Sequence, residues 1–244
     1  LNLQGSGTKT ANSNITQQYV NVASGVTLDN NATLTATTLT NTGTVQSVAT
    51  NLHTDVSNSN LLILEGGTYG NYTISGTGTT QLAADTVNNG TITQATLDTN
   101  NHKLTNSSGK TVTVNTTLTN TGEINNAGTL TVNGANQNLG LITNATGTLN
   151  LNGTGVKTAD ANVTQNKINI ASGVTLTNNS TITATSINNS GTINSIADNL
   201  IGSSYNKGIM NLSGTTAGTI NNLDSTNGVI NLADGLDVSH SIQY

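Results

Sequence analysis

Hydrophobic and polar residues alternate in short runs that follow many of the glycines in this chain. Clear examples span residues 90–92, 128–132 and 147–151, where threonine or asparagine alternates with isoleucine, leucine or valine. A period of two is typical of β-strands with one buried face, and no stretch shows the 3.6-residue period of an amphipathic helix. The pattern predicts short strands along the whole chain.

These short strands recur at a nearly constant interval. The series Gly90, Gly109, Gly128 and Gly147 has a constant step of 19 (109 − 90, 128 − 109, 147 − 128), and other glycine intervals range from 18 (Gly25–Gly43) to 23 (Gly43–Gly66). A strand unit repeating about every 20 residues indicates a solenoid. We predict an all-β fold, a parallel β-helix with roughly twelve coils of about 18–24 residues each.

The corners of these coils have their own signature, aliphatic-x-Asn-x-Gly-x-aliphatic. It occurs at residues 39–45, 118–124, 124–130 and 187–193. Asparagine and glycine tolerate left-handed backbone angles, so this unit predicts a corner between two strands. With several corners per coil, parallel strands would stack about 4.8 Å apart.

A longer repeat lies on top of the short one. Residues 1–52 align without gaps onto residues 149–200 at an offset of 148, with 31 identities in the 52 pairs. We therefore predict one β-helical segment over residues 1–244, with an internal duplication of 1–148 and 149–244 whose second copy is incomplete. A single catalytic cleft is seldom built from such repetition. The duplication therefore favours an extended repeat structure.

Composition supports a narrow interior made of small side chains. Aromatic residues are 2% and charged residues 7% of the chain, and proline, cysteine, tryptophan and phenylalanine are absent. Layers of valine, leucine, isoleucine and alanine can stack on copies of themselves, whereas wide rings would not repeat well. Equivalent asparagines can stack as amide ladders, each donating to the next coil. Asn106, Asn125 and Asn144 are the candidates for one structural ladder.

Several segments resemble the repeats of large secreted bacterial adhesins. They are Ala32–Ser47 (ATLTATTLTNTGTVQS), Ser180–Ser195 (STITATSINNSGTINS) and Leu118–Gly134 (LTNTGEINNAGTLTVNG). They are similar to filamentous-haemagglutinin-type exoproteins and autotransporter passenger domains, which carry Leu-x-Asn-x-Gly-x-Ile units at about this period. The resemblance implies a right-handed parallel β-helix, displayed outside a bacterial cell and used for attachment or aggregation.

Charge and residue types exclude several other classes of function. The net charge of −5 and six basic residues provide no basic patch, which argues against binding nucleic acid or anionic lipid. No apolar run approaches the about 18 residues of a membrane span, so we expect no membrane insertion. The sequence has no arginine, and its three histidines have no metal-ligand spacing. We therefore expect no catalytic residues, no metal and no cofactor.

A tyrosine pair is the candidate ligand site. His53–Asn60 (HTDVSNSN), the least repetitive stretch, predicts a loop that projects from a coil. It precedes Tyr69 and Tyr72, which with nearby Glu65 could stack on sugar rings and bind their hydroxyls. The second copy has Ala217 and Ile220 opposite the two tyrosines, so the coil does not require them, and the isoleucine favours an inward Tyr72 as the alternative.

Four functions stay open at this point. The first is a surface adhesin segment that acts through its lateral face, by self-association or by contact with a cell-surface receptor such as a glycan. The second is a passive stalk for a binding tip elsewhere. The third is ice binding by outward Thr-x-Thr pairs, which occur at 33–35, 91–93, 111–113, 129–131 and 181–183. The fourth is a β-helix that binds or cleaves polysaccharides. We favour the extracellular adhesin.

Overall fold

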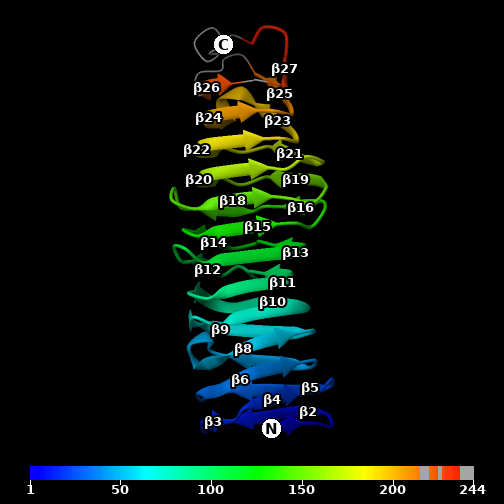
Figure 1. Cartoon of the computed structure of the whole chain (residues 1–244), viewed down its shortest axis with the longest axis vertical. Coiled ribbons are helices and arrows are strands. Elements are labelled where there is room, and N and C mark those ends of the chain that lie inside the picture. The colour runs from blue at the N-terminus through cyan, green and yellow to red at the C-terminus, as the bar shows by residue number, and fades with distance from the viewer. Residues whose placement is uncertain (215–219, 225–226, 237–244) are drawn as a thin grey trace. The chain divides into compact units, whose positions relative to one another are not determined.

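The computed structural model describes residues 1–214, 220–224 and 227–236. The chain is 66% strand and 3% helix, and its parallel strands stack as a β-solenoid of about 12 turns (Figure 1). The predicted all-β parallel β-helix is confirmed. The chain divides into two compact units, Leu1–Ile124 and Asn125–Tyr244. The boundary between these units falls before Leu149, where the second sequence copy begins, so the units and the copies do not coincide.

The N-terminal unit contains thirteen strands and one 3-10 helix, several of the strands bending around a corner. They are β1 (Asn2–Leu3), β2 (Gly7–Ala11), β3 (Ile15–Thr16), β4 (Tyr19–Val22), β5 (Val26–Asn30), β6 (Leu34–Asn41), β7 (Thr44–Ser47), η1 (Ala49–Asn51), β8 (Leu52–Asn58), β9 (Leu61–Tyr69), β10 (Thr73–Asn88), β11 (Thr91–Asp98), β12 (Lys103–Asn106) and β13 (Thr111–Thr119). Strand β14 (Glu123–Asn126) contains the boundary between the units.

The C-terminal unit repeats this arrangement. Its described elements are β15 (Thr129–Val132), β16 (Gln137–Asn138), β17 (Leu141–Thr143), β18 (Thr148–Leu151), β19 (Gly155–Ala159), β20 (Val163–Ile170), β21 (Val174–Asn178), β22 (Ile182–Asn189), β23 (Thr192–Ile196), η2 (Ala197–Asn199), β24 (Leu200–Asn206), β25 (Ile209–Ser213), β26 (Ile220–Asp224) and β27 (Val229–Leu232). Helix η2 follows η1 at the offset of the sequence repeat (197 − 49 = 149 − 1), so even this irregular element belongs to the duplicated block.

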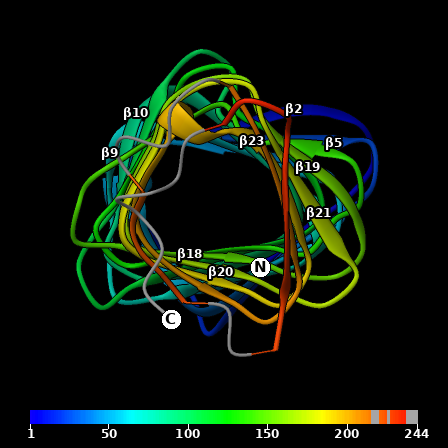
Figure 2. The same cartoon turned by 90° about the horizontal axis from the view of Figure 1, so that it is seen from above.

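Each turn visits three faces, which we call first, second and third in chain order. In the N-terminal unit, residues 38–41, 44–47 and 52–53 belong to the first, second and third faces, and each pairs in parallel with the turns beside it. In the C-terminal unit, residues 167–170, 174–178 and 182–184 play the same parts. Figure 2 shows β18 and β20 on one side of the coil, and β19, β21 and β23 on another.

Aliphatic side chains stack in columns inside each unit. On the first face of the N-terminal unit one column runs through six successive turns in register: Val20, Leu39, Val56, Ile74, Ile92 and Val112. All six side chains are at most 1% exposed. This is the predicted stacking of like on like, and it contributes roughly 25 cal/mol for each Å² of apolar surface that leaves water.

The stretch His53–Asn60 is largely strand, so the predicted projecting loop is wrong. Residues 53–58 belong to β8, with His53 and Asp55 outward and Val56 inward. The inward positions include the polar Thr54 and Asn58, which hid the period of two from the sequence pattern. Both are satisfied inside, because the Thr54 hydroxyl donates to the Asp55 carbonyl (2.9 Å) and Asn58 joins an amide ladder.

Candidate functional site

Tyr69 lies in the interior of the N-terminal unit, so the prediction that it presents its ring to a ligand is wrong. Its side chain is 0% exposed, and its hydroxyl donates to the Thr54 carbonyl at 2.9 Å. Burial, helped by the nearby Asp55 carboxylate and Tyr72, raises the pKa of Tyr69 far above its ordinary value. The residue is therefore a neutral hydrogen-bond donor within the core. One ring fits inside because it occupies a single turn and need not repeat.

The other two predicted ligand residues, Tyr72 and Glu65, contact different partners. Tyr72 is half-buried, and its ring lies nearly parallel to that of His53, with 6.2 Å between centroids and 19° between planes. Glu65 is half-buried and accepts a hydrogen bond from the Gln46 side chain at 2.5 Å. The role of Tyr72 in binding stays a prediction, and His53 is the partner that sequence analysis missed.

The three predicted ladder asparagines do not form one ladder. Asn106 is buried in the N-terminal unit and accepts from the Asn88 amide at 2.9 Å. In the C-terminal unit, half-buried Asn144 donates to Asn125 at 3.0 Å. Asn106 ends strand β12 and Asn126, not Asn125, ends β14 with the same burial pattern. The equivalent positions Asn106 and Asn126 are 20 residues apart, one more than the regular glycine step of 19. Applying the glycine step therefore selected Asn125 instead of Asn126.

Buried amide ladders do exist, and the duplication reproduces them. Asn41 donates to Asn58 at 2.8 Å, and the equivalent pair in the second copy, Asn189 and Asn206, does so at 2.7 Å. Likewise Asn30 donates to Ser47, and Asn178 to Ser195, at 3.0 and 2.9 Å. The duplication thus preserves the polar interior as well as the aliphatic columns.

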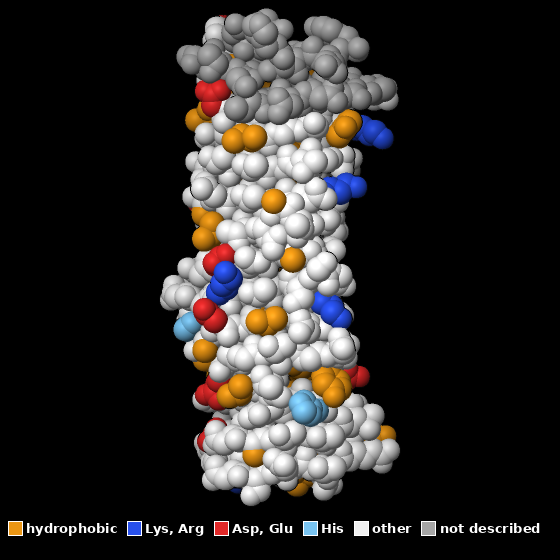
Figure 3. All heavy atoms as spheres, turned by 90° about the vertical axis from the view of Figure 1, so that its left-hand side faces the viewer, with side chains coloured by type: hydrophobic (Ala, Val, Ile, Leu, Met, Phe, Trp, Pro, Cys, Tyr) orange, Lys and Arg blue, Asp and Glu red, His pale blue; other side chains and the backbone are white. Residues whose placement is uncertain are grey.

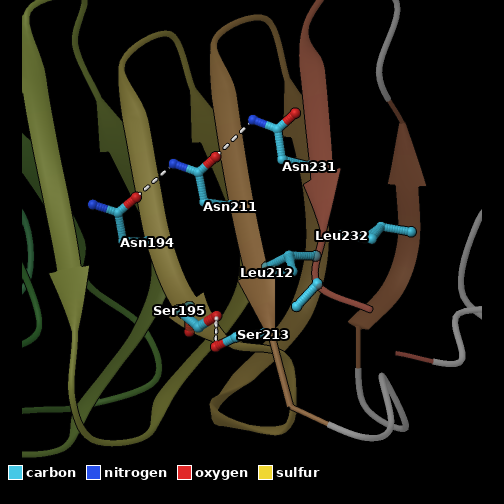
Figure 4. Close-up of a pocket in the computed structure, with 8 residues that line it drawn as sticks. Asn194, Ser195, Asn211, Leu212, Ser213, Asn231 and Leu232 are labelled. Atoms are coloured by element: carbon cyan, nitrogen blue, oxygen red, sulfur yellow. Dashed lines mark hydrogen bonds between the residues drawn. The ribbon is translucent and has the colours of Figure 1, made fainter. Parts of the chain in front are cut away.

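A second kind of ladder points outward in the C-terminal unit. On the first face, Asn188 donates to Asn169, and Asn169 to Asn150, at 2.8 and 2.7 Å. On the second face, Asn231 donates to Asn211 and Asn211 to Asn194, at 2.7 and 2.6 Å, as the parallel rungs of Figure 4 show. We call these six residues the outward ladders. An amide has two N–H donors and an oxygen with two lone pairs, so each rung keeps capacity for a partner.

Apolar side chains and two shallow pockets flank the second-face ladder. Ile209 and Val229 pair in register and are 40% and 53% exposed. A pocket of about 390 Å³ is lined by all three ladder asparagines together with Leu212, Leu232 and neighbouring small residues (Figure 4). A second pocket, of about 310 Å³, continues past Asn194 to Ile196. The surface combines repeated amides with exposed aliphatic groups, and the exposed charged residues nearest to it along the chain are Asp198, Lys207 and Asp234.

Threonine pairs occupy more than one face. Pairs at 91–93 and 111–113 stack in register on the first face of the N-terminal unit, next to Thr73 and Ser75. The pairs at 33–35 and 181–183 lie on the third faces of their units. An ice-binding surface needs a regular array of such pairs on a single face. Ice binding stays a prediction, which a thermal-hysteresis assay would test.

Figure 3 shows mostly neutral polar side chains and backbone on one side of the molecule, with few charged groups. No group of three or more histidine, aspartate or glutamate side chains gathers anywhere in the part of the chain that the structure describes. Among the same residues, no helix has the length and apolar character needed to cross a bilayer.

A lysine side chain is buried in the C-terminal unit. Lys157 on β19 is 0% exposed, and its ammonium group donates to the carbonyls of Gly134 and Thr154. The equivalent residue in the first sequence copy is Lys9. Its ammonium group likewise donates to the carbonyl three residues earlier, that of Ser6, but its side chain is exposed. Burial of Lys157 lowers its pKa below the ordinary 10.5, because desolvation penalises the charged form.

This shift predicts a pH dependence of stability. Between the lowered folded pKa and 10.5, the unfolded chain binds more protons, so stability rises as pH increases through that window. We expect the melting temperature of the wild type to rise relative to that of Lys157→Met as the pH increases toward 10.5. Thermal unfolding of both proteins in a pH series measures this relative rise, and parallel curves would contradict it.

Comparisons with known proteins give no further guide to the site. No family model matches this chain, and neither the curated proteins nor the solved structures include a match.

Proposed function

We propose that this chain is part of an extracellular bacterial adhesin that attaches or aggregates cells through the lateral surface of its β-helix. It acts by binding and not by catalysis. The observation that carries the proposal is the pair of outward ladders, Asn150–Asn169–Asn188 and Asn194–Asn211–Asn231. The resemblance of the repeats to secreted adhesins supports the same conclusion.

The physical argument rests on repetition with little charge, since Lys167 on β20 is the one charged side chain on the six strands that contribute the rungs. Each rung offers an amide donor and acceptor, and rungs follow one another at the strand spacing of about 4.8 Å. A second copy of the chain offers the same row at the same spacing, so several weak hydrogen bonds of about 1 kcal/mol each can form together. Exposed Ile209 and Val229 beside the second-face ladder add apolar area to such a contact. Low charge keeps the repulsion between two copies small.

We expect reversible self-association in sedimentation velocity over a wide concentration range. A variant with Asn169→Asp and Asn211→Asp should associate at least about tenfold more weakly, because like carboxylates would face each other in the contact. Added salt should restore part of the loss by screening.

The matched control places the same two negative charges on residues outside the ladders. Asn166 and Ser172 are exposed, and the double variant Asn166→Asp with Ser172→Asp should leave the association unchanged. A monomer at every concentration, or equal weakening by both double variants, would contradict the proposal and favour a passive stalk.

A further inference from the structure

Two aromatic rings form a small platform on the surface of the N-terminal unit. His53 lies on β8 and Tyr72 lies just before β10, in the next turn. Their planes are 19° from parallel, with 6.2 Å between centroids. His53 is exposed and Tyr72 half-buried, so part of each ring faces outward. Because the two rings stack, each turns one face toward the other, and what they offer a ligand is the free part of the exposed His53 ring together with the polar edges of both rings.

The interior holds this platform in place. The buried Tyr69 packs against Tyr72 with 6.3 Å between ring centroids and 58° between planes. Tyr69 is itself fixed by its bond to the Thr54 carbonyl, and Thr54 lies between His53 and Asp55 on the same strand. Tyr69 is therefore a positioning residue. A pre-formed platform loses little conformational entropy when a ligand binds.

Hydrogen-bonding groups surround the rings. The carboxylate of exposed Asp55 accepts the backbone N–H of Thr73 through one oxygen (2.8 Å), which orients the other. The oxygen of exposed Asn71 accepts from the Lys110 ammonium at 2.8 Å, which leaves the Asn71 amide as a donor. Among the described residues, none hydrogen bonds to the Tyr72 hydroxyl or to the His53 ring.

We propose that His53, Tyr72, Asp55 and Asn71 form a binding site for a neutral saccharide. The C–H face of a sugar ring packs on aromatic rings, while its hydroxyls need a few well-placed donors and acceptors. Asp55 supplies an acceptor, and Asn71 and the Tyr72 hydroxyl supply donors. At the site the Asp55 carboxylate and the Lys110 ammonium, which donates to Asn71, balance each other in charge, and the net charge of −5 of the chain disfavours acidic sugars and nucleic acid, so the site favours an uncharged ligand.

The second sequence copy shows that the fold does not need this site. Strand register places Ile201 where copy one has His53, since each pairs with the matching threonine, Thr183 or Thr35. By the same register Ser203 replaces Asp55. These replacements already occur in stacked turns of this chain, so they provide variants that remove the site and are compatible with folding.

The test is saturation-transfer difference NMR with the whole chain. The probes are neutral oligosaccharides of glucose, galactose, mannose and N-acetylglucosamine, with sialylated and sulfated oligosaccharides as the acidic arm. We expect transfer to at least one neutral saccharide. Binding should weaken about tenfold or more in the double variant His53→Ile, Asp55→Ser and in Tyr72→Ala. It should persist in Tyr205→Ala, which removes an exposed tyrosine of the C-terminal unit.

The result that overturns the proposal is equally defined. Transfer to no neutral saccharide, transfer to acidic saccharides alone, or full binding by the double variant with an unchanged circular-dichroism spectrum would each do so. The site is independent of the outward ladders, so the double Asn→Asp variant of the self-association test should bind the saccharide as the wild type does. Failure of one proposal thus leaves the other standing.

Discussion

Leu130→Asp should lower the free energy of unfolding by about 4 kcal/mol or more, because it places an unpaired carboxylate in an aliphatic column. Leu130 is 0% exposed, and it pairs in register with Leu149, which pairs in turn with Ile168. The substitution removes the apolar contacts and leaves a charge with no partner. Circular dichroism during heating and during urea titration measures the loss.

The adjacent residue gives the control. Thr131 points outward on the same strand, where its hydroxyl accepts from Asn150 at 3.3 Å. Thr131→Asp keeps an acceptor at this position and adds the same charge, so its effect should stay within about 1 kcal/mol. Equal destabilisation by the two variants would mean that Leu130 does not face the interior.

This contrast between Leu130 and Thr131 also shows why the fold could be predicted. In a strand, neighbouring side chains point to opposite faces, and only aliphatic residues of similar size stack turn after turn. The sequence pattern TLTV at 129–132 therefore determines which side chains are buried. Repetition at about 20 residues then favours a solenoid, in which each turn buries its strands against the turns beside it.

Irregular turns escaped prediction because their inward positions are polar or unusually large. In β8 the inward Thr54 and Asn58 look like loop residues until their hydrogen-bond partners, which come from the local backbone and another turn, are known. Tyr69 was expected to bind a ligand because the second copy has Ala217 opposite it, so that the coil does not require a ring there, yet the ring is buried and needs room in one turn only. Spacing along the chain contains neither fact.

The candidate surfaces depended on register, which the sequence determines only in part. The first-face ladder requires that Asn150, Asn169 and Asn188 keep a constant step of 19 residues. The second-face ladder uses steps of 17 and 20 residues, and corner residues absorb the difference. The His53–Tyr72 pair, in contrast, keeps the regular step of 19 residues (72 − 53). Corner length is therefore the information that repeat counting lacks.

Gly90 and Gly109 also show what repeat counting lacks. They are successive members of the regular glycine series, but the structure requires a glycine at each for a different reason. A Cβ on Gly90 would lie 2.1 Å from the Tyr72 carbonyl oxygen, which accepts the Thr91 N–H of the turn stacked on it. A Cβ on Gly109 would meet nothing within 4 Å, but its φ of +72° is a left-handed conformation.

Gly90→Ala should therefore destabilise the N-terminal unit by about 3 kcal/mol or more, because two backbone segments must separate and lose a ladder hydrogen bond. Gly109→Ala should cost only the about 1–2 kcal/mol of placing a Cβ in left-handed backbone. Thermal unfolding of the two variants, with hydrogen exchange of the Thr91 amide, measures both effects. Exchange at Thr91 should accelerate in Gly90→Ala alone. Equal losses of stability and equal exchange rates would mean that the Tyr72 carbonyl oxygen lies farther from Gly90 than the 2.1 Å between this oxygen and an added Cβ implies.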